Sequence, residues 1–187
     1  MRILMVNASP KKNGATEQVL QWMKEALEEQ YETESVCLGE QSIAFCRGCK
    51  QCYKTGRCVL PADGVEELLH RMERNDAILF AVPSYWGDVP AQFKALIDRC
   101  TPYADTNPLP GHPCPAAGKR VFAAALRAGG RTGECEHLLQ CVEHWSGHMG
   151  AEYDGGVMLT RVDGKEDLTL EQEVSVKSAV NAWISKK

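Results

Sequence analysis

The regular alternation of short apolar runs with helical stretches is the feature of this sequence that most constrains its fold. Runs that are short and apolar or β-branched predict strands at residues 2–7, 31–37, 77–82, 120–126 and 152–158. Apolar side chains that recur every three or four positions predict helices at residues 16–30, 64–74, 91–100, 134–148 and 169–185. Alternating strands and helices favour a parallel sheet covered by helices on both faces, because each crossover is long and right-handed.

Five such units favour an α/β, flavodoxin-like three-layer fold whose parallel strands follow the order 2-1-3-4-5. In this order the chain reverses direction across the sheet between the first and third strands, so ligands are expected beyond their carboxyl ends. The length of 187 residues suits one domain, and the proline-rich residues 101–118 are expected to be irregular. We therefore predict a single domain over 1–187, with a four-cysteine loop inserted at about 44–60.

The composition excludes several classes of protein. Hydrophobic residues make up 44% of the chain and charged residues 25%, which argues against a disordered or fibrous protein. The formal net charge of −4 argues against nucleic acid as a partner. Apolar runs are too short to span a bilayer, and the first residues enter a strand without a signal peptide. A cytoplasmic protein without membrane contact is therefore expected, with its nine cysteines reduced or ligated rather than disulfide-bonded.

The loop after the first strand, NASPKKNGAT at residues 7–16, has the features of a phosphate-binding loop. Ser9 and Thr16 supply hydroxyls, Gly14 permits a tight turn, and Lys11 or Lys12 adds positive charge. The helix that follows offers free backbone N–H groups at its start, where phosphates bind. The loop matches neither the Walker A nor the dinucleotide motif. An ordinary turn with Thr16 as the helix N-cap is the alternative, and the position at the predicted crossover favours a ligand.

Two further loops lie at the same predicted sheet edge. The loop after the third strand carries Tyr85 and Trp86 beside Gly87, and aromatic faces of this kind hold flat heterocycles. The glycine-rich loop at 127–133 would let backbone amides approach the edge of such a ring. The alternatives are that the aromatic side chains pack on the core or a neighbouring subunit, and that the glycines serve only the turn.

Four of the cysteines form a compact motif, Cys46-x2-Cys49-x2-Cys52-x5-Cys58. Thiolates at consecutive x2 spacings wrap a cubane, as in bacterial ferredoxins, so the spacing favours a 4Fe-4S cluster. Zinc is the poorer fit because zinc knuckles are separated by a longer gap, and unligated thiols remain an alternative. The motif also carries four basic residues that could offset the charge of the thiolates or attract an acidic electron carrier such as ferredoxin: Arg47, Lys50, Lys54 and Arg57.

Other polar residues give no catalytic pattern. His144 and His148 are four positions apart on a predicted helix, but HWSGH is not the HExxH zinc motif, so we expect structural or solvent-facing roles. Asp98 and Arg99 are expected to end a helix and form local ion pairs. No acid–base pair or serine nucleophile motif is evident, which suits a protein whose cofactor carries the chemistry.

The segments NASPKKNGAT, AVPSYW, ALIDR (95–99) and AGG (128–130), in this order, resemble the NADPH-dependent FMN reductase group of flavodoxin-like proteins over most of the chain. The resemblance implies FMN, with NAD(P)H as a possible electron donor. Ala15 departs from the Asn or Gly common in the family, which removes a polar contact but keeps the loop. The residues that the resemblance implies around FMN are Ser9, Lys11, Asn13, Gly14, Ala15, Thr16, Pro83, Ser84, Tyr85, Trp86, Gly87, Gly129 and Gly130.

The cysteine motif further resembles the iron–sulfur flavoprotein branch of this family. The resemblance implies Cys46, Cys49, Cys52 and Cys58 as cluster ligands, and electron transfer between FMN and the cluster. An NAD(P)H-dependent FMN or quinone reductase without a cluster is the alternative enzyme. An electron carrier of the flavodoxin type or a zinc-stabilised binding module would be a different class of protein. The family also implies a homodimer or homotetramer, with Trp86 or Trp145 exposed at the contacts.

Overall fold

The computed structural model describes residues 1–27, 31–109 and 113–186. Its centre is one five-stranded sheet in which every pair of neighbouring strands is parallel, in the order β2-β1-β3-β4-β5. The predicted fold class and strand order are therefore confirmed. The strands are β1 (Arg2–Asn7), β2 (Glu32–Cys37), β3 (Ala77–Pro83), β4 (Arg120–Leu126) and β5 (Glu152–Leu159).

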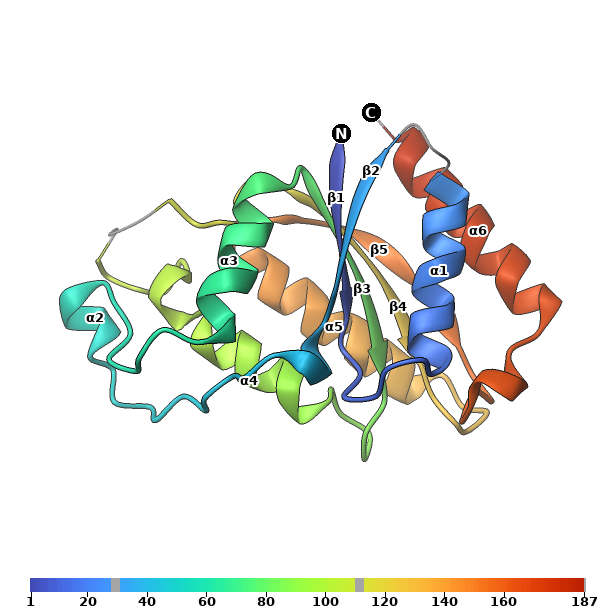
Figure 1. Cartoon of the computed structure of the whole chain (residues 1–187), viewed down its shortest axis with the longest axis horizontal. Coiled ribbons are helices and arrows are strands. Elements are labelled where there is room, and N and C mark those ends of the chain that lie inside the picture. Colours follow the sequence, from blue (N-terminus) through green and yellow to red (C-terminus); the bar gives the residue numbers. More distant parts are fainter. Residues whose placement is uncertain (28–30, 110–112, 187) are drawn as a thin grey trace.

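Helices cover both faces of the sheet, which makes the three layers visible in Figure 1. α1 (Ala15–Leu27) and α6 (Leu170–Ser185) lie on one face, and α3 (Gly64–Arg74), α4 (Ala91–Arg99) and α5 (Gly133–His148) lie on the other. α2 (Cys52–Thr55) is a single turn within the cysteine segment that the sequence did not predict, because four residues are too few to show helical periodicity. The remaining turns are the 3-10 helices η1 (Leu38–Glu40), η2 (Thr101–Tyr103) and η3 (Lys165–Asp167).

Strand side chains alternate between two separate apolar clusters, as the two-residue period of a strand requires. Leu4 and Val6 of β1 pack with the α3, α4 and α5 layer, whereas Ile3 and Met5 pack with α1 and α6. Trp145 of α5 is buried edge-on against Phe80, with ring centroids 5.3 Å apart. The expectation that Trp145 is exposed for a subunit contact is therefore wrong, because its indole fills the core.

The ends of the helices are close to those predicted. α1 begins at Ala15, so Thr16 lies inside the first turn and is not the N-cap. The predicted end of this helix at residues 28–30 lies outside the described residues. Asp63 begins α3 with a capping box, in which Glu66 accepts a hydrogen bond from the Asp63 amide while Asp63 accepts one from Val65.

The carboxyl ends of the strands meet at one edge of the sheet, and the cysteine segment runs away from this edge past α3 and α4 (Figure 1). Within the described part of the chain, each helix is too short or too polar to cross a membrane.

Candidate functional site

A groove of about 490 Å³ lies between α4 and α5. A cavity of about 630 Å³ lies at the carboxyl edge of the sheet. Its walls come from the loops after β1, β3 and β4 and from the segment after β5, so it lies where the predicted strand order places a ligand. The residues that line it are Ser9, Lys11, Asn13, Gly14, Ala15, Thr16, Pro83, Ser84, Tyr85, Trp86, Leu126, Arg127, Ala128, Val162, Asp163, Gly164, Lys165 and Glu166.

All three predicted loops thus contribute to one cavity, the third of them through Arg127 and Ala128. Three predicted residues, Gly87, Gly129 and Gly130, lie close in sequence to its wall but are not among the lining residues. The wall formed by Leu126 and Val162–Glu166 was not predicted from the sequence. Nothing in the local sequence indicates that the turn after β5 folds back over this cavity.

The predicted phosphate loop, residues 7–16, is held mainly by its own side chains. The Ser9 amide donates to Asn7 Oδ1 at 2.9 Å, and the Lys11 amide donates to Ser9 Oγ at 3.0 Å. The Asn13 amide donates to the Glu17 carboxylate at 2.7 Å, so this carboxylate occupies one donor of the loop. Gly14, Ala15 and Thr16 line the cavity at the start of α1, where backbone amides have no intrahelical acceptor. Lys12 instead pairs with Glu40, which leaves Lys11 as the lysine of this loop that lines the cavity.

The aromatic loop is a tight hairpin turn. Tyr85 and Asp88 exchange both backbone hydrogen bonds, at 2.9 and 3.1 Å, and the two residues between them have φ angles of +55° and +79°. Two successive positive φ angles define a type I′ turn, which explains the glycine at position 87. The turn leaves the Trp86 side chain fully exposed beside the cavity, and Tyr85 about half exposed. A flat ring entering the cavity would therefore find uncovered aromatic faces at its rim.

Glu134, in the first turn of α5, ties two of the loops together. Its carboxylate accepts a hydrogen bond from Ser84 Oγ at 2.7 Å and pairs with Arg127 Nη2 at 3.0 Å. Arg127 also donates to the Arg131 carbonyl at 2.8 Å, and its guanidinium lies where a Cβ at Gly129 would be. Gly129 therefore makes room for this arginine rather than lining the cavity. This network fixes the relative position of the loops after β3 and β4.

The lining suits FMN on two observations of the structure. Among the described residues, Arg127 Nε is buried without a hydrogen-bond partner, and Arg127 lines the cavity, so this N–H is available to an acceptor on a bound ring. At the other side the start of α1, with Lys11, offers donors and positive charge suited to a phosphate. A cavity of this size with aromatic, apolar and donor groups fits a flavin mononucleotide.

The cysteine segment forms a further cavity of about 190 Å³, lined by all four motif cysteines, Cys46, Cys49, Cys52 and Cys58, together with parts of α4 and η2. The Gly48 amide lies 3.4 Å from Cys46 Sγ, in the position of an N–H···S hydrogen bond to a thiolate. Left-handed backbone at Gly48, Lys50 and Gly56 curls the segment around this cavity. Burial raises the pKa of the Cys52 thiol, and the charges of the other three cysteines raise it further. Four cysteines that line one cavity, and whose charges as thiolates a cation would offset, fit a metal cluster.

Arg99 closes the wall of the cysteine cavity, with only 1% of its side chain exposed. Its Nη1 donates to Asp63 Oδ2 at 2.6 Å and to the Ala44 carbonyl at 3.0 Å. Its Nε and Nη2 are buried without a hydrogen bond among the described residues, and Nη2 lies 3.6 Å from Glu66. The expectation of a local ion pair is right for Asp98, which pairs with Lys94, but wrong for Arg99. Four thiolates in this cavity would carry negative charge, and the buried Arg99 guanidinium in the same wall would offset it.

Comparison with known proteins places the chain in a family. The sequence profile of the NADPH-dependent FMN reductase family matches residues 1–160. An iron–sulfur flavoprotein of Methanosarcina thermophila is 32% identical over 147 residues, which cover 78% of this chain and 72% of that protein. An iron–sulfur flavoprotein of Methanocaldococcus jannaschii is 35% identical over 103 residues. The match covers 54% of this chain and 53% of that relative, so the chain spans about half of the relative's length.

Solved structures share the fold. An NAD(P)H:quinone oxidoreductase from Methanothermobacter marburgensis superposes with a TM-score of 0.74 at 18% identity, covering 100% of this chain and 98% of that one. A flavone reductase superposes with a TM-score of 0.75 at 15% identity, covering 97% of this chain and 61% of that one. The predicted enzyme class, a flavin-dependent oxidoreductase, is confirmed by the family match, which also supports FMN as the cofactor. This chain therefore belongs to the NADPH-dependent FMN reductase family, in its iron–sulfur flavoprotein branch.

Proposed function

We propose that this protein is an FMN-dependent oxidoreductase that passes electrons between FMN and a 4Fe-4S cluster held by Cys46, Cys49, Cys52 and Cys58. The observation that carries the proposal is that all four cysteines line one cavity, next to a buried arginine. The names of the relatives, which are iron–sulfur flavoproteins, point in the same direction. The cavity at the carboxyl edge of the sheet would hold the FMN.

Each part of the carboxyl-edge cavity has a task in this proposal. The start of α1, with Ser9, Lys11 and Thr16, would bind the phosphate, since hydroxyls, a cation and free amides converge there. Tyr85 and Trp86 would cover the ring, and Arg127 would donate to its edge. FMN supplies the conversion between two-electron and one-electron chemistry, while these residues bind, orient and exclude water.

The cysteine segment also offers a surface for an electron-transfer partner. Its basic residues, Arg47, Lys50, Lys54 and Arg57, are all exposed. Phe45 and Val59 are exposed apolar side chains at its two ends. An acidic carrier such as a ferredoxin suits a basic surface of this kind, because complementary charges steer association and weaken with salt.

A cluster-free NAD(P)H-dependent FMN or quinone reductase is the second candidate. The exposed faces of Tyr85 and Trp86 favour it, since they leave space for a second flat ring, such as a nicotinamide or a quinone, beside the flavin. Both candidates place the same cofactor in the carboxyl-edge cavity and differ in whether the cysteine cavity holds iron.

Anaerobic purification followed by iron, acid-labile sulfide and flavin assays separates the candidates. The first predicts about four iron and four sulfide per chain with one FMN, as the composition of a 4Fe-4S cluster requires. Cys49→Ser should remove most of the iron but keep FMN bound, because no residue lines both cavities. Cys114→Ser, a cysteine outside both cavities, is the control and should keep iron and FMN.

FMN without iron in the wild-type protein, after anaerobic reconstitution with iron and sulfide, would establish the second candidate instead. Zinc without flavin would contradict both. Loss of FMN together with iron in Cys49→Ser would show that the two sites are not separate.

A further inference from the structure

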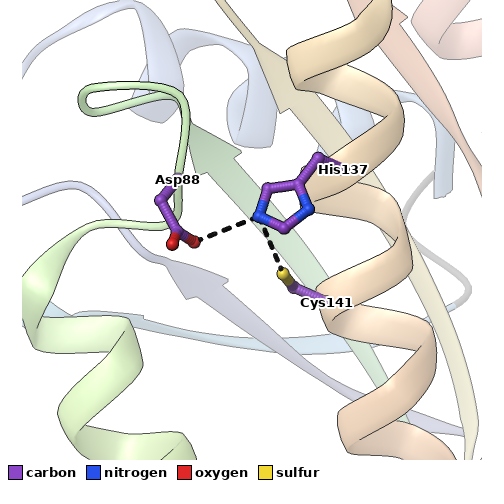
Figure 2. Close-up of side chains that lie close together, drawn as sticks. All are labelled: Asp88, His137 and Cys141. Carbon is purple, nitrogen blue, oxygen red and sulfur yellow. Dashed lines mark hydrogen bonds and ion pairs between the residues drawn. The ribbon is translucent and has the colours of Figure 1, made fainter.

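A third site lies in the groove between α4 and α5. We propose that Asp88, His137 and Cys141 bind a divalent transition-metal ion of the zinc class, independently of the four-cysteine motif. In the described part of the chain this is the group of His, Cys, Asp and Glu residues in which three donor atoms all lie within 4.8 Å of one another. Figure 2 shows the carboxylate, the imidazole and the thiol pointing toward a common point.

The local sequence explains how three donors meet. His137 and Cys141 are one turn apart on α5, so their side chains share a face of the helix. Asp88 is the last residue of the hairpin turn that follows β3, and β3 lies beside β4, which leads into α5. The amide of Val89 donates to Asp88 Oδ1 at 2.7 Å and so orients the carboxylate, as second-shell groups do around metal ligands.

Two of the three donor distances match the edges of a tetrahedral site, and the third, between the Asp88 carboxylate and Cys141 Sγ, is within 4.8 Å. His137 Nε2 is 3.4 Å from Asp88 Oδ1 and 3.6 Å from Cys141 Sγ. Metal–ligand bonds of about 2.0–2.1 Å to nitrogen or oxygen and about 2.3 Å to sulfur, at tetrahedral angles, give edges of about 3.3 Å and about 3.6 Å. An ion could therefore enter with little movement of the side chains.

The position of His137 Nε2, close to both Asp88 and Cys141, argues against a nucleophilic triad. In a Cys–His–Asp relay, one imidazole nitrogen faces the thiol while the other is held by the carboxylate. Here Nε2 faces both the carboxylate and the thiol (Figure 2). One nitrogen cannot donate to the carboxylate and take the thiol proton at the same time, whereas three donors around one point suit a shared cation.

The donor set and the surroundings define the ligand. Imidazole and thiolate with one carboxylate suit a borderline ion such as Zn²⁺ rather than Mg²⁺ or Ca²⁺, which prefer oxygen ligands. Asp88, His137 and Cys141 line the groove of about 490 Å³, so the fourth position would face this space. A zinc site with three protein ligands and one open position is the arrangement of sites that bind water or a small ligand. The ion would also link the hairpin that carries Tyr85 and Trp86 to α5.

Titration with Co²⁺, which replaces Zn²⁺ and reports thiolate ligation by its absorption, tests the proposal. The full chain is used without an affinity tag, with Cys46, Cys49, Cys52 and Cys58 replaced by Ser so that those thiols do not compete. A phosphine reductant keeps Cys141 reduced without binding the metal. One Co²⁺ per chain with a thiolate charge-transfer band is expected, and Zn²⁺ should displace it.

Three variants remove the ligands one at a time. Cys141→Ser should abolish the thiolate band, and His137→Ala and Asp88→Asn should each weaken binding at least about tenfold, the minimum seen even for second-shell changes. His144→Ala is the matched control, because His144 lines the same groove one turn further along α5 and should leave binding unchanged. No binding, binding unaffected by Cys141→Ser, or loss in His144→Ala would each overturn the proposal. Since the cluster ligands are absent from every sample, the outcome is independent of the proposed electron transfer.

Discussion

Arg99 is a buried charge whose partners are supplied by the start of α3. Asp63 caps that helix and at the same time accepts hydrogen bonds from the Ala44 amide at 2.9 Å and from Arg99 at 2.6 Å. One carboxylate thus joins α3, α4 and the entrance of the cysteine segment. Burial by itself would raise the pKa of Asp63, but the hydrogen bonds from Ala44, Val65 and Arg99 outweigh it and lower the pKa below its usual range.

Replacing Asp63 by Asn should destabilise the fold by about 3–5 kcal/mol, since the buried Arg99 guanidinium loses its hydrogen-bonded counter-charge and keeps only Glu66, 3.6 Å away. Asp98→Asn is the control, because the Lys94–Asp98 pair is exposed and worth at most about 1 kcal/mol. Urea unfolding of the cluster-free protein at neutral pH measures both. Equal losses in the free energy of unfolding would show that the buried Arg99–Asp63 pair stabilises the fold no more than the exposed pair does.

The same carboxylate predicts a pH dependence. A pKa lower in the folded than in the unfolded state stabilises the fold above the unfolded value of about 3.9, and this stabilisation is lost as the pH falls through the folded-state pKa. The urea midpoint of the wild-type protein should therefore fall more steeply below about pH 4 than that of Asp63→Asn. Parallel curves for the two proteins would contradict the assignment to Asp63.

At the scale of elements, η1 packs directly against the predicted phosphate loop. Gly39 lies so close to this loop that a Cβ would be 2.3 Å from the Pro10 carbonyl oxygen. Cys37 Sγ, just before η1, is 3.6 Å from the Ser9 carbonyl, and Lys12 pairs with Glu40. The short turn after β2 therefore fixes the position of the loop that would bind the FMN phosphate, although this turn is distant from the loop in sequence.

Gly39→Ala should displace the phosphate loop, because backbone atoms cannot yield as a flexible side chain can. We expect FMN affinity to fall at least about tenfold, the consequence of about 1.4 kcal/mol lost at the phosphate. Gly147→Ala on α5 is the matched control, since a Cβ there meets nothing within 4 Å and a helical Gly→Ala change is stabilising. Fluorescence titration of the apoprotein with FMN measures both. Wild-type affinity in Gly39→Ala would show that the loop is not set by η1.

At the scale of the whole molecule, the two proposed cofactor cavities belong to different parts of the architecture. The carboxyl-edge cavity is built on the loops of β1, β3, β4 and β5, so the sheet positions it. The cysteine cavity is built on a segment that runs outside the α3 and α4 layer and contributes none of the residues buried in the two apolar clusters. The segment therefore behaves, in our proposal, as an insertion on a complete flavin-binding scaffold.

Replacing residues 46–58 by a short Gly/Ser linker should thus leave a folded protein that binds one FMN and no iron. Ala44, Asp63 and Arg99 stay in this variant, so the buried ion pair is preserved. Circular dichroism, flavin content and iron content are the measurements, with Cys49→Ser in the full chain as the reference. A variant that fails to fold or to hold FMN would show that the segment is part of the scaffold.

The sequence by itself determined the element order, the sheet topology, and three of the loops that line the carboxyl-edge cavity. Hydrophobic periodicity is a local property, and the right-handed crossover leaves few topologies for five βα units. The spacing of the cysteines is local as well, so the common cavity of Cys46, Cys49, Cys52 and Cys58 could be anticipated.

Only the tertiary structure decided which distant residues meet. Arg99 reaches Asp63 across 36 positions, the turn after β5 lines the carboxyl-edge cavity, and Asp88 of the hairpin after β3 meets His137 and Cys141 of α5. Tertiary packing also decided that the Trp145 side chain is buried in the core and is not exposed for a subunit contact. Such contacts depend on the angles and distances at which helices pack on the sheet, and these arise from the interlocking of many side chains rather than from any local pattern.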